Sequence, residues 1–358
     1  MRVVVSGYFG FDNLGDEAIL SAMLAALRPR LPGASFVALS GDPASTERQH
    51  GIAAVPRIGP GALRAVAGAD LLLSGGGSLI QDVTSARSAL YYLGMLRAGR
   101  GLARRAMMYA QGIGPIDRPW LRTLTGWVCS GVDVLTVRDE DSRRLLQSCG
   151  VRRPIEVVAD PAFALEAAPP DRAVALLGAA RGPRIGVAVR PWGDNAYLAP
   201  LLAGLRQLRE QVGGEIILLV FHRTKDEALS ARAASELGGR VISGVAPDEM
   251  LAVIGAMDLV VGARLHALIC AVAAGVAPVA VGYDPKVEAL VRRTGIGALP
   301  PVGSLTASAT ARTLSAAWSA KEETRASLRA QGPALKAAAL RAADLAAALA
   351  GNLSKSTE

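Results

Sequence analysis

Short apolar runs alternate with amphipathic segments along most of the chain, and this alternation constrains the fold more than any other feature. Most of the runs are continuous, as in strands that helices cover on both faces. Between them, apolar residues recur at helical spacing, as at Leu20, Met23, Leu24 and Leu27. The pattern predicts an α/β fold built on parallel sheets. The expected strands are residues 2–6, 35–39, 70–74, 106–111, 132–137, 155–158, 184–189, 215–221, 241–243, 259–262 and 278–281.

Proline and glycine breaks at residues 169–170 and 182–183 divide this pattern into two halves of similar size. The 358 residues suit about two domains. We therefore expect two Rossmann-like domains whose parallel sheets face a cleft, over residues 1–170 and 183–300. Ala-rich helices, broken near Gly332 and Pro333, should follow over 301–350, and residues 351–358 should fray.

Composition excludes several classes of protein. The chain is 51% hydrophobic and 20% charged, so it can bury a large core. It contains no run of 18 apolar residues, and its start does not resemble a signal peptide, so we expect a cytoplasmic protein. Cys129, Cys149 and Cys270 are odd in number and far apart, which favours buried thiols over disulfides or a zinc site.

The net charge of +8 comes from an excess of arginine, 34 against 5 lysines. This excess reflects either genome composition or an anionic partner. Nucleic acid is disfavoured, because aromatic residues are scarce and no basic run is interleaved with them. A cationic segment would allow peripheral docking on an anionic membrane, or it is an ordinary solvated helix end. Its members are Arg97, Arg100, Arg104 and Arg105.

A glycine-rich loop, residues 7–17, joins the first expected strand to the first helix. Such loops let a ligand approach the backbone, and a helix N-terminus favours anions. The glycine spacing is not that of a dinucleotide fingerprint. Asn13, Gly15 and Asp16 are the candidates here. Asp16 is either a helix N-cap or a carboxylate that serves as a base or binds a sugar.

Further strands end in similar turns. Gly75, Gly76 and Gly77 follow one strand, and Gln111 opens a second glycine-rich turn. The three glycines either bind a ligand or only turn the chain. Arg138 ends another strand, where its guanidinium suits a carboxylate or phosphate, or forms an ion pair with Asp139 or Asp141.

The second half places three basic side chains after neighbouring strands. Arg264 and His266 open a helix after residues 259–262, and Lys286 follows residues 278–281. Together they describe a pocket for a small, highly charged anion. The alternative is that His266 is a core or capping residue. We expect His50 on the surface, whereas His222 is a weaker candidate for the site.

Taken together and in order, these motifs resemble the polysaccharide pyruvyl transferase family, specifically its CsaB type. The resemblance extends from residue 3 to about 295 and includes every loop described above. The motifs are residues 10–17 (GFDNLGDE), 75–82 (GGGSLIQD), 111–115 (QGIGP), 137–139 (VRD), 159–161 (ADP), 190–192 (RPW), 264–268 (RLHAL) and 283–286 (YDPK).

The resemblance implies a fold like that of GT-B glycosyltransferases. It also implies transfer of pyruvate from phosphoenolpyruvate to two hydroxyls of a sugar, giving a cyclic ketal and phosphate. For the CsaB type the acceptor is N-acetylmannosamine on a lipid-linked precursor of a secondary cell-wall polymer, whose ketal anchors surface-layer proteins. Phosphoenolpyruvate is a co-substrate, and neither a metal nor another cofactor is expected.

The resemblance and the reaction chemistry together assign roles to the candidates. His266 would be the acid/base on the donor side, and Asp16 would take the acceptor's proton. Arg138, Arg264 and Lys286 would hold the phosphate and carboxylate of the donor. Asn13, Gly15, Gly75, Gly76, Gly77 and Gln111 would form loops around acceptor and phosphate.

Two alternatives remain open. A nucleotide-sugar glycosyltransferase of the same architecture would bind a diphosphate through the basic residues and a ribose through an acid such as Glu288. A basic scaffold protein at the membrane would use the arginine segment and have no turnover. The products released from the donor, phosphate or nucleotide, distinguish the two enzymes.

Overall fold

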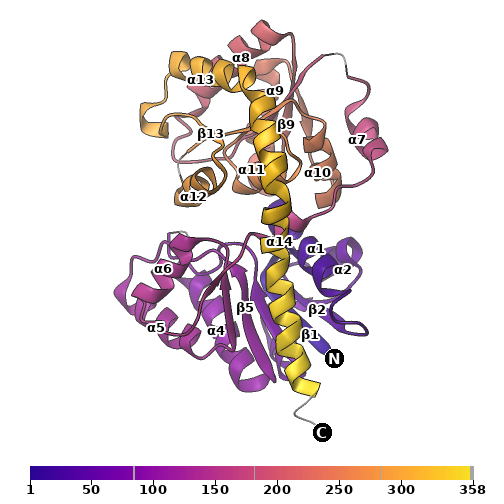
Figure 1. The fold of residues 1–358 in the computed structure, drawn as a ribbon, viewed down its shortest axis with the longest axis vertical. Coiled ribbons are helices and arrows are strands. Elements are labelled where there is room, and N and C mark those ends of the chain that lie inside the picture. Colours follow the sequence, from indigo (N-terminus) through magenta and orange to yellow (C-terminus); the bar gives the residue numbers. More distant parts are fainter. Residues whose placement is uncertain (84, 181, 283, 355–358) are drawn as a thin grey trace. The chain divides into compact units, whose positions relative to one another are not determined.

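The computed structural model describes residues 1–83, 85–180, 182–282 and 284–354. It contains two compact units, each built around one parallel sheet with helices on both faces (Figure 1). Unit 1 consists of Met1–Ala164 and Leu335–Glu358, and unit 2 of Leu165–Ala334. The predicted α/β fold is therefore confirmed in both halves.

Unit 1 contains a seven-stranded sheet in the order β3-β2-β1-β4-β5-β6-β7, with every pairing parallel. The strands are β1 (Arg2–Phe9), β2 (Ser35–Ser40), β3 (Ala53–Pro56), β4 (Leu71–Gly75), β5 (Arg105–Gln111), β6 (Val134–Val137) and β7 (Glu156–Val157). The helices are α1 (Leu14–Leu27), α2 (Pro43–His50), α3 (Pro60–Ala67), α4 (Ala86–Leu102), α5 (Pro119–Ser130) and α6 (Glu140–Ser148), and a 3₁₀ turn, η1, covers Pro161–Ala164.

The apolar run of β1, residues 3–5, shows why these strands contain consecutive hydrophobic residues. Successive side chains of a strand point to opposite faces of the sheet. Val3 and Val5 accordingly pack into a core with α1, whereas Val4 packs into a second core with α3 and α4. Because helices cover both faces, both sets of side chains in this run are apolar.

Unit 2 contains a six-stranded parallel sheet in the order β10-β9-β8-β11-β12-β13. Its helices α8 (Leu198–Val212) and α13 (Ala307–Ser319) approach closely, since a Cβ on Gly204 would lie 2.5 Å from Thr310 Cγ2. The strands are β8 (Arg184–Ala188), β9 (Glu215–Leu219), β10 (Arg240–Ile242), β11 (Leu259–Gly262), β12 (Pro278–Ala280) and β13 (Gly297–Ala298). The helices are α7 (Pro170–Leu177), α8 (Leu198–Val212), α9 (Arg223–Leu237), α10 (Pro247–Gly255), α11 (Leu265–Ala273), α12 (Pro285–Thr294) and α13 (Ala307–Ser319), and a 3₁₀ turn, η2, covers Val302–Ser304.

All eleven predicted strands occur, with ends shifted by a few residues. Two strands, β3 and β13, were not predicted from the sequence, and each is one of the two edge strands of its sheet. Both are short, and neither has a fully buried position, so burial imposes little on their sequences.

The C-terminal segment is a single long helix, α14 (Lys321–Ser354), drawn in yellow in Figure 1. The expected break near Gly332 and Pro333 is wrong. A proline costs its helix one hydrogen bond, but Leu328 before it and Leu335 after it are both buried, and their packing offsets this loss. The segment 301–350, which we expected to be separate, is divided between the two units at residue 334. Of the tail expected to fray, 351–354 is helical and 355–358 lies outside the described residues.

None of the described helices combines the length and apolarity needed to cross a membrane. None of the three cysteines forms a disulfide within the described residues. Cys129 and Cys270 are buried as expected, whereas Cys149 is partly exposed. Burial raises the pKa of the Cys129 thiol to about 12, so this thiol is inert at neutral pH.

Candidate functional site

The loop after β1 fixes the carboxylate of Asp16. Asn13 is the N-cap of α1, and its Oδ1 accepts a hydrogen bond from the Gly15 amide at 3.3 Å. Asn13 Nδ2 also donates to Asp16 Oδ2. Asp16 is the third residue of the helix and is 7% exposed. The N-cap interpretation of Asp16 is therefore wrong, because Asn13 has that role and also orients the Asp16 side chain.

The three glycines after β4 allow two close approaches as well as a turn. Gly76 and Gly77 both have a φ of +73°, a conformation that favours glycine. A Cβ on Gly76 would lie 1.9 Å from Ile19 Cγ2, and one on Gly77 would lie 2.6 Å from Asp16 Oδ1. The Asp16 carboxylate thus lies directly against the Gly77 backbone.

Arg138 lies immediately beyond this loop and is held by two side chains. Its Nη1 donates to Asp160 Oδ2 at 2.9 Å, and its Nη2 donates to Ser78 Oγ at 2.8 Å. Arg138 is 5% exposed and Asp160 is 2% exposed. Asp139, one of the two partners considered from the sequence, is more distant, at 3.6 Å from Nε. A Cβ on Gly112 would lie 2.7 Å from Arg138 Nε, so this glycine is required as well.

Gln111 connects the ends of two strands and is fully buried. Its Nε2 donates to the carbonyl and to the hydroxyl of Ser74, both at 2.9 Å. Asp16, the glycine loop, Gln111 and Arg138 therefore lie along the carboxyl ends of β1, β4, β5 and β6. Ligands of open α/β sheets bind at this edge.

His50 belongs to the support of this edge and is not on the surface, so the sequence-based expectation for it is wrong. Its Nε2 lies 2.8 Å from Glu17 Oε2, and its Nδ1 lies 3.3 Å from Ser21 Oγ. Glu17 Oε1 accepts a hydrogen bond from the Gly10 amide at 2.8 Å. Glu17 and His50 are both buried. They anchor the glycine-rich loop that precedes Asp16.

In unit 2, Arg264 forms a bidentate ion pair that the sequence analysis missed. Its Nε donates to Asp226 Oδ2 at 2.8 Å, and its Nη2 donates to Asp226 Oδ1. Asp226 is fully buried and also accepts from the His222 amide at 3.0 Å. Burial raises the pKa of the Asp226 carboxyl above its ordinary value, although Arg264 acts against this shift. The one sequence signal for this pair was Asp226 itself, an acidic residue in the first turn of α9.

His266 and Lys286 follow neighbouring strands. His266 is the second residue of α11 and half-buried, and β11, which precedes it, pairs with β12. Lys286 lies in the first turn of α12, where its amide donates to the N-cap Asp284 at 3.0 Å. The structure thus brings Arg264, His266 and Lys286 to one edge of the unit 2 sheet. Tyr283 of the same motif lies outside the described residues.

Arg190 and Tyr197 were not predicted as site residues, whereas His222 was a weaker candidate. Arg190 follows β8, and the Tyr197 hydroxyl donates to its carbonyl at 2.6 Å. Burial raises the pKa of Tyr197, Asp226 adds to this shift, and Arg190 and Arg264 oppose it. His222, buried at the end of β9, lies 3.2 Å from Thr224 Oγ1 through Nδ1. Two arginines, Arg264 and Arg190, therefore act electrostatically on the buried Asp226 carboxylate.

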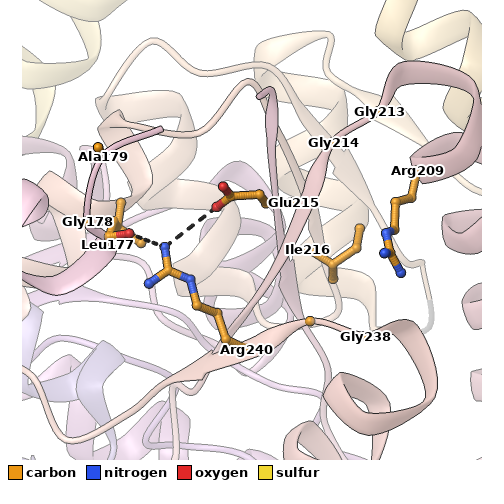
Figure 2. Close-up of a pocket in the computed structure, with 11 residues that line it drawn as sticks. Leu177, Gly178, Ala179, Arg209, Gly213, Gly214, Glu215, Ile216, Gly238 and Arg240 are labelled. Atoms are coloured by element: carbon orange, nitrogen blue, oxygen red, sulfur yellow. Dashed lines mark hydrogen bonds and ion pairs between the residues drawn. The ribbon is translucent and has the colours of Figure 1, made fainter. Parts of the chain in front are cut away.

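A pocket of 570 Å³ lies elsewhere in unit 2, at the amino ends of β9 and β10 (Figure 2). Its arginines already bind the protein. Arg240 donates to the Leu177 carbonyl and lies 3.7 Å from Glu215, and Arg209 donates to the Leu237 carbonyl. These contacts cap helix ends and do not leave a cationic site. The carboxyl edges of the two sheets are therefore better candidates for the functional site than this pocket.

Comparison with known proteins gives both a family and a fold. A family model described as polysaccharide pyruvyl transferase matches residues 13–285. No curated protein matches the chain.

Three solved structures illustrate the similarity in fold. A putative UDP-N-acetylglucosamine 2-epimerase from Listeria monocytogenes is 12% identical with a TM-score of 0.66, over 95% of this chain and 94% of its own. The UDP-GlcNAc 2-epimerase from Neisseria meningitidis is 10% identical with a TM-score of 0.63, over 97% and 99%. The ADP-heptose LPS heptosyltransferase II from E. coli is 15% identical with a TM-score of 0.51, over 90% and 100%.

At these identities the structures show the fold alone, which is GT-B-like. The family model, in contrast, covers well over half of the chain and includes every motif described above except residues 10–12 of the first and residue 286 of the last. The chain therefore belongs to the polysaccharide pyruvyl transferase family.

Proposed function

We propose that this protein transfers pyruvate from phosphoenolpyruvate to two hydroxyls of one sugar residue, forming a cyclic ketal and releasing phosphate. The observation that carries the proposal is the family match over residues 13–285. The placement of acidic and basic side chains at the carboxyl edges of both sheets supports it. Phosphoenolpyruvate bears a phosphate and a carboxylate on three carbons, so its binding requires several cations.

The reaction requires an acid and a base. The methylene carbon of the donor accepts a proton, which leaves an oxocarbenium-like centre at the neighbouring carbon. One sugar hydroxyl attacks this centre and loses its proton, and a second hydroxyl then displaces phosphate and loses its own. We assign protonation of the donor to His266 and removal of a hydroxyl proton to Asp16.

The remaining roles follow from charge. Arg138, Arg264 and Lys286 bind the donor's anionic groups and stabilise the departing phosphate. Asp160 and Asp226 are positioning residues, because each fixes the plane of one guanidinium through a buried ion pair. Asn13 and Gly77 orient and accommodate the Asp16 carboxylate, and Gly15, Gly75, Gly76 and Gln111 shape the surrounding loops.

The finer part of the proposal is the CsaB-type acceptor. It is N-acetylmannosamine on a lipid-linked precursor of a secondary cell-wall polymer, whose ketal would anchor surface-layer proteins. The enzyme would then work at the cytoplasmic face of the membrane, with no cofactor besides the co-substrate. Three arginines of the cationic segment already pair with carboxylates: Arg100 and Arg105 with Asp133, and Arg104 with Asp70. Membrane docking by this segment would therefore depend mainly on Arg97, which lies over the exposed Trp127 ring.

A nucleotide-sugar glycosyltransferase is the second candidate. The GT-B-like fold and the solved heptosyltransferase with the same architecture favour it. The family match favours pyruvyl transfer, and the product released from the donor distinguishes the two.

The test is to incubate the full-length protein with phosphoenolpyruvate and an acceptor that ends in N-acetylmannosamine. We expect phosphate release and an acceptor mass increased by one pyruvate ketal. His266→Gln and Asp16→Asn should each lose most activity, whereas Arg232→Gln, an exposed change on α9, should not. No product with any wall-type acceptor, or near-full activity in His266→Gln, would contradict the proposal.

A further inference from the structure

Arg57 lies among aromatic rings at the carboxyl edge of the unit 1 sheet. It follows β3, and its amide donates to the Ser40 carbonyl at the end of β2 at 2.9 Å. Its guanidinium carbon lies 4.1 Å from the centroid of the Tyr91 ring, 5.3 Å from that of Phe11 and 5.4 Å from that of Tyr92. Three rings therefore fix the position of this cation.

No carboxylate of the described residues lies within ion-pair distance of Arg57. Its Nε is buried and makes no hydrogen bond with any described residue. Arg138 and Arg264 differ in this respect, since each binds a buried aspartate. A guanidinium that is half-buried without a counter-ion loses hydration and gains no ion pair in return. An anionic ligand would supply the missing partner.

Phe11 stacks on Tyr8, whose hydroxyl is influenced by the charge of Asp16. Tyr8 and Phe11 stack with their centroids 4.3 Å apart and their planes 13° from parallel, and both are half-buried. Burial raises the pKa of the Tyr8 hydroxyl, the charge of Asp16 adds to this shift, and Arg57 opposes it. Tyr8 is thus within electrostatic reach of both charged groups. The cluster Tyr8, Phe11 and Arg57, which we call the arginine–aromatic cluster, adjoins the carboxylate assigned to the acceptor.

We infer that the arginine–aromatic cluster is an acceptor subsite in which Arg57 binds a phosphate or diphosphate attached to the acceptor sugar. Aromatic side chains present a flat apolar surface beside a polar group, which suits a sugar ring that carries an anion. Phosphoenolpyruvate has no ring to place against Tyr8 and Phe11. The inference rests on the proposed function, because that function makes Asp16 the group that meets the acceptor.

The kinetic test compares two acceptors that share one disaccharide ending in N-acetylmannosamine. One carries a diphosphate with a short alkyl chain, and the other is the neutral alkyl glycoside. Loss of a hydrogen bond to a charged group costs about 1.5–3 kcal/mol, which is roughly a 10- to 150-fold change. We expect Arg57→Gln to raise KM for the diphosphate acceptor by this factor and to leave KM for the neutral acceptor and for phosphoenolpyruvate unchanged.

Matched variants separate the charge effect from a loss of structure. Arg48→Gln removes an exposed arginine of α2 and should leave every KM unchanged. Arg57→Lys keeps the charge without the planar fork and should lie between wild type and Arg57→Gln, so it provides the test if Arg57→Gln does not fold. An equal rise in KM for both acceptors, or a rise for phosphoenolpyruvate alone, would overturn the inference.

Direct binding distinguishes this inference from the proposed function. The affinity of the wild type for each acceptor is measured by calorimetry without phosphoenolpyruvate. If the diphosphate acceptor binds through Arg57 but phosphoenolpyruvate is never consumed, the proposed reaction fails and the subsite stands. If Arg57→Gln binds the diphosphate acceptor as tightly as wild type does, the subsite is refuted whatever the reaction.

Discussion

Replacing Gly77 with alanine should lower activity far more than stability. The φ of Gly77 is +73°, and a Cβ there would lie 2.6 Å from Asp16 Oδ1. The backbone strain of alanine in this conformation is about 1–2 kcal/mol. Nonbonded atoms of this kind prefer a separation of about 3.5 Å, so the carboxylate must withdraw by roughly 1 Å.

That movement determines the expected result. The carboxylate is the end of a side chain and can withdraw at little cost to the fold, so the free energy of unfolding should fall only by the backbone strain. A misplacement of about 1 Å can reduce a catalytic rate by roughly 10²-fold. We therefore expect kcat to fall about 10- to 100-fold while the protein remains folded.

Gly51→Ala is the matched control. Gly51 ends α2 with a φ of +61°, and a Cβ there would have no neighbouring atom within 4 Å. Alanine at position 51 therefore imposes similar backbone strain without displacing a carboxylate. Unfolding in urea and phosphate release from phosphoenolpyruvate are measured for both variants. Equal activity in the two variants at equal stability would refute the assignment of Asp16 to the reaction.

Three further changes test the supporting contacts. His50→Leu removes the partner of the buried Glu17 carboxylate and should lower the free energy of unfolding in urea by about 2–3 kcal/mol, whereas a surface histidine would change it by less than about 0.5 kcal/mol. Asp226→Ala leaves Arg264 without its buried partner and should cost about 3–5 kcal/mol in the same measurement; an unchanged stability would show that the pair is not formed. Burial acts to raise the pKa of Asp82, but hydrogen bonds from the Asp117 and Arg118 amides and the Arg118 charge together hold it below its ordinary value. Ionised Asp82 therefore stabilises the fold above about pH 4, and this contribution is lost as the pH falls through the lowered pKa. Urea denaturation from pH 7 to pH 3 should show a steeper loss of stability in wild type than in Asp82→Asn, and parallel curves would contradict this.

The sequence predicted the buried part of the fold because burial leaves a local signal. A strand such as β11 has no polar side chain and is buried at every position, since helices cover both faces of its sheet. The short strands β3 and β13 lack this signal because no position in either is fully buried. The continuity of α14 through Pro333 was equally invisible, since it depends on packing along the helix and not on local preference.

The candidate site was predictable where a charged side chain comes shortly after the end of a strand in the sequence. Asp16, Arg138, Arg264, His266 and Lys286 lie at the carboxyl edges of the two sheets, as the loop positions indicated. Their partners were not predictable, because these are distant in sequence. Asp160 is 22 residues from Arg138, Asp226 is 38 from Arg264, and Glu17 is 33 from His50. Only the folded chain shows which carboxylate each basic group meets.

The path of the chain has a consequence for the order in which the protein can fold during synthesis. Ala342, Ala343 and Ala346 of α14 pack into the same core as Val3 and Ile19. A ribosome thus finishes all of unit 2 before it makes the last residues that the core of unit 1 needs. The first 164 residues must wait, with part of the apolar surface around β1 uncovered, while the next 170 are made. This reverses the usual sequence in which N-terminal domains complete first, and it leaves apolar surface of nascent unit 1 uncovered for longer.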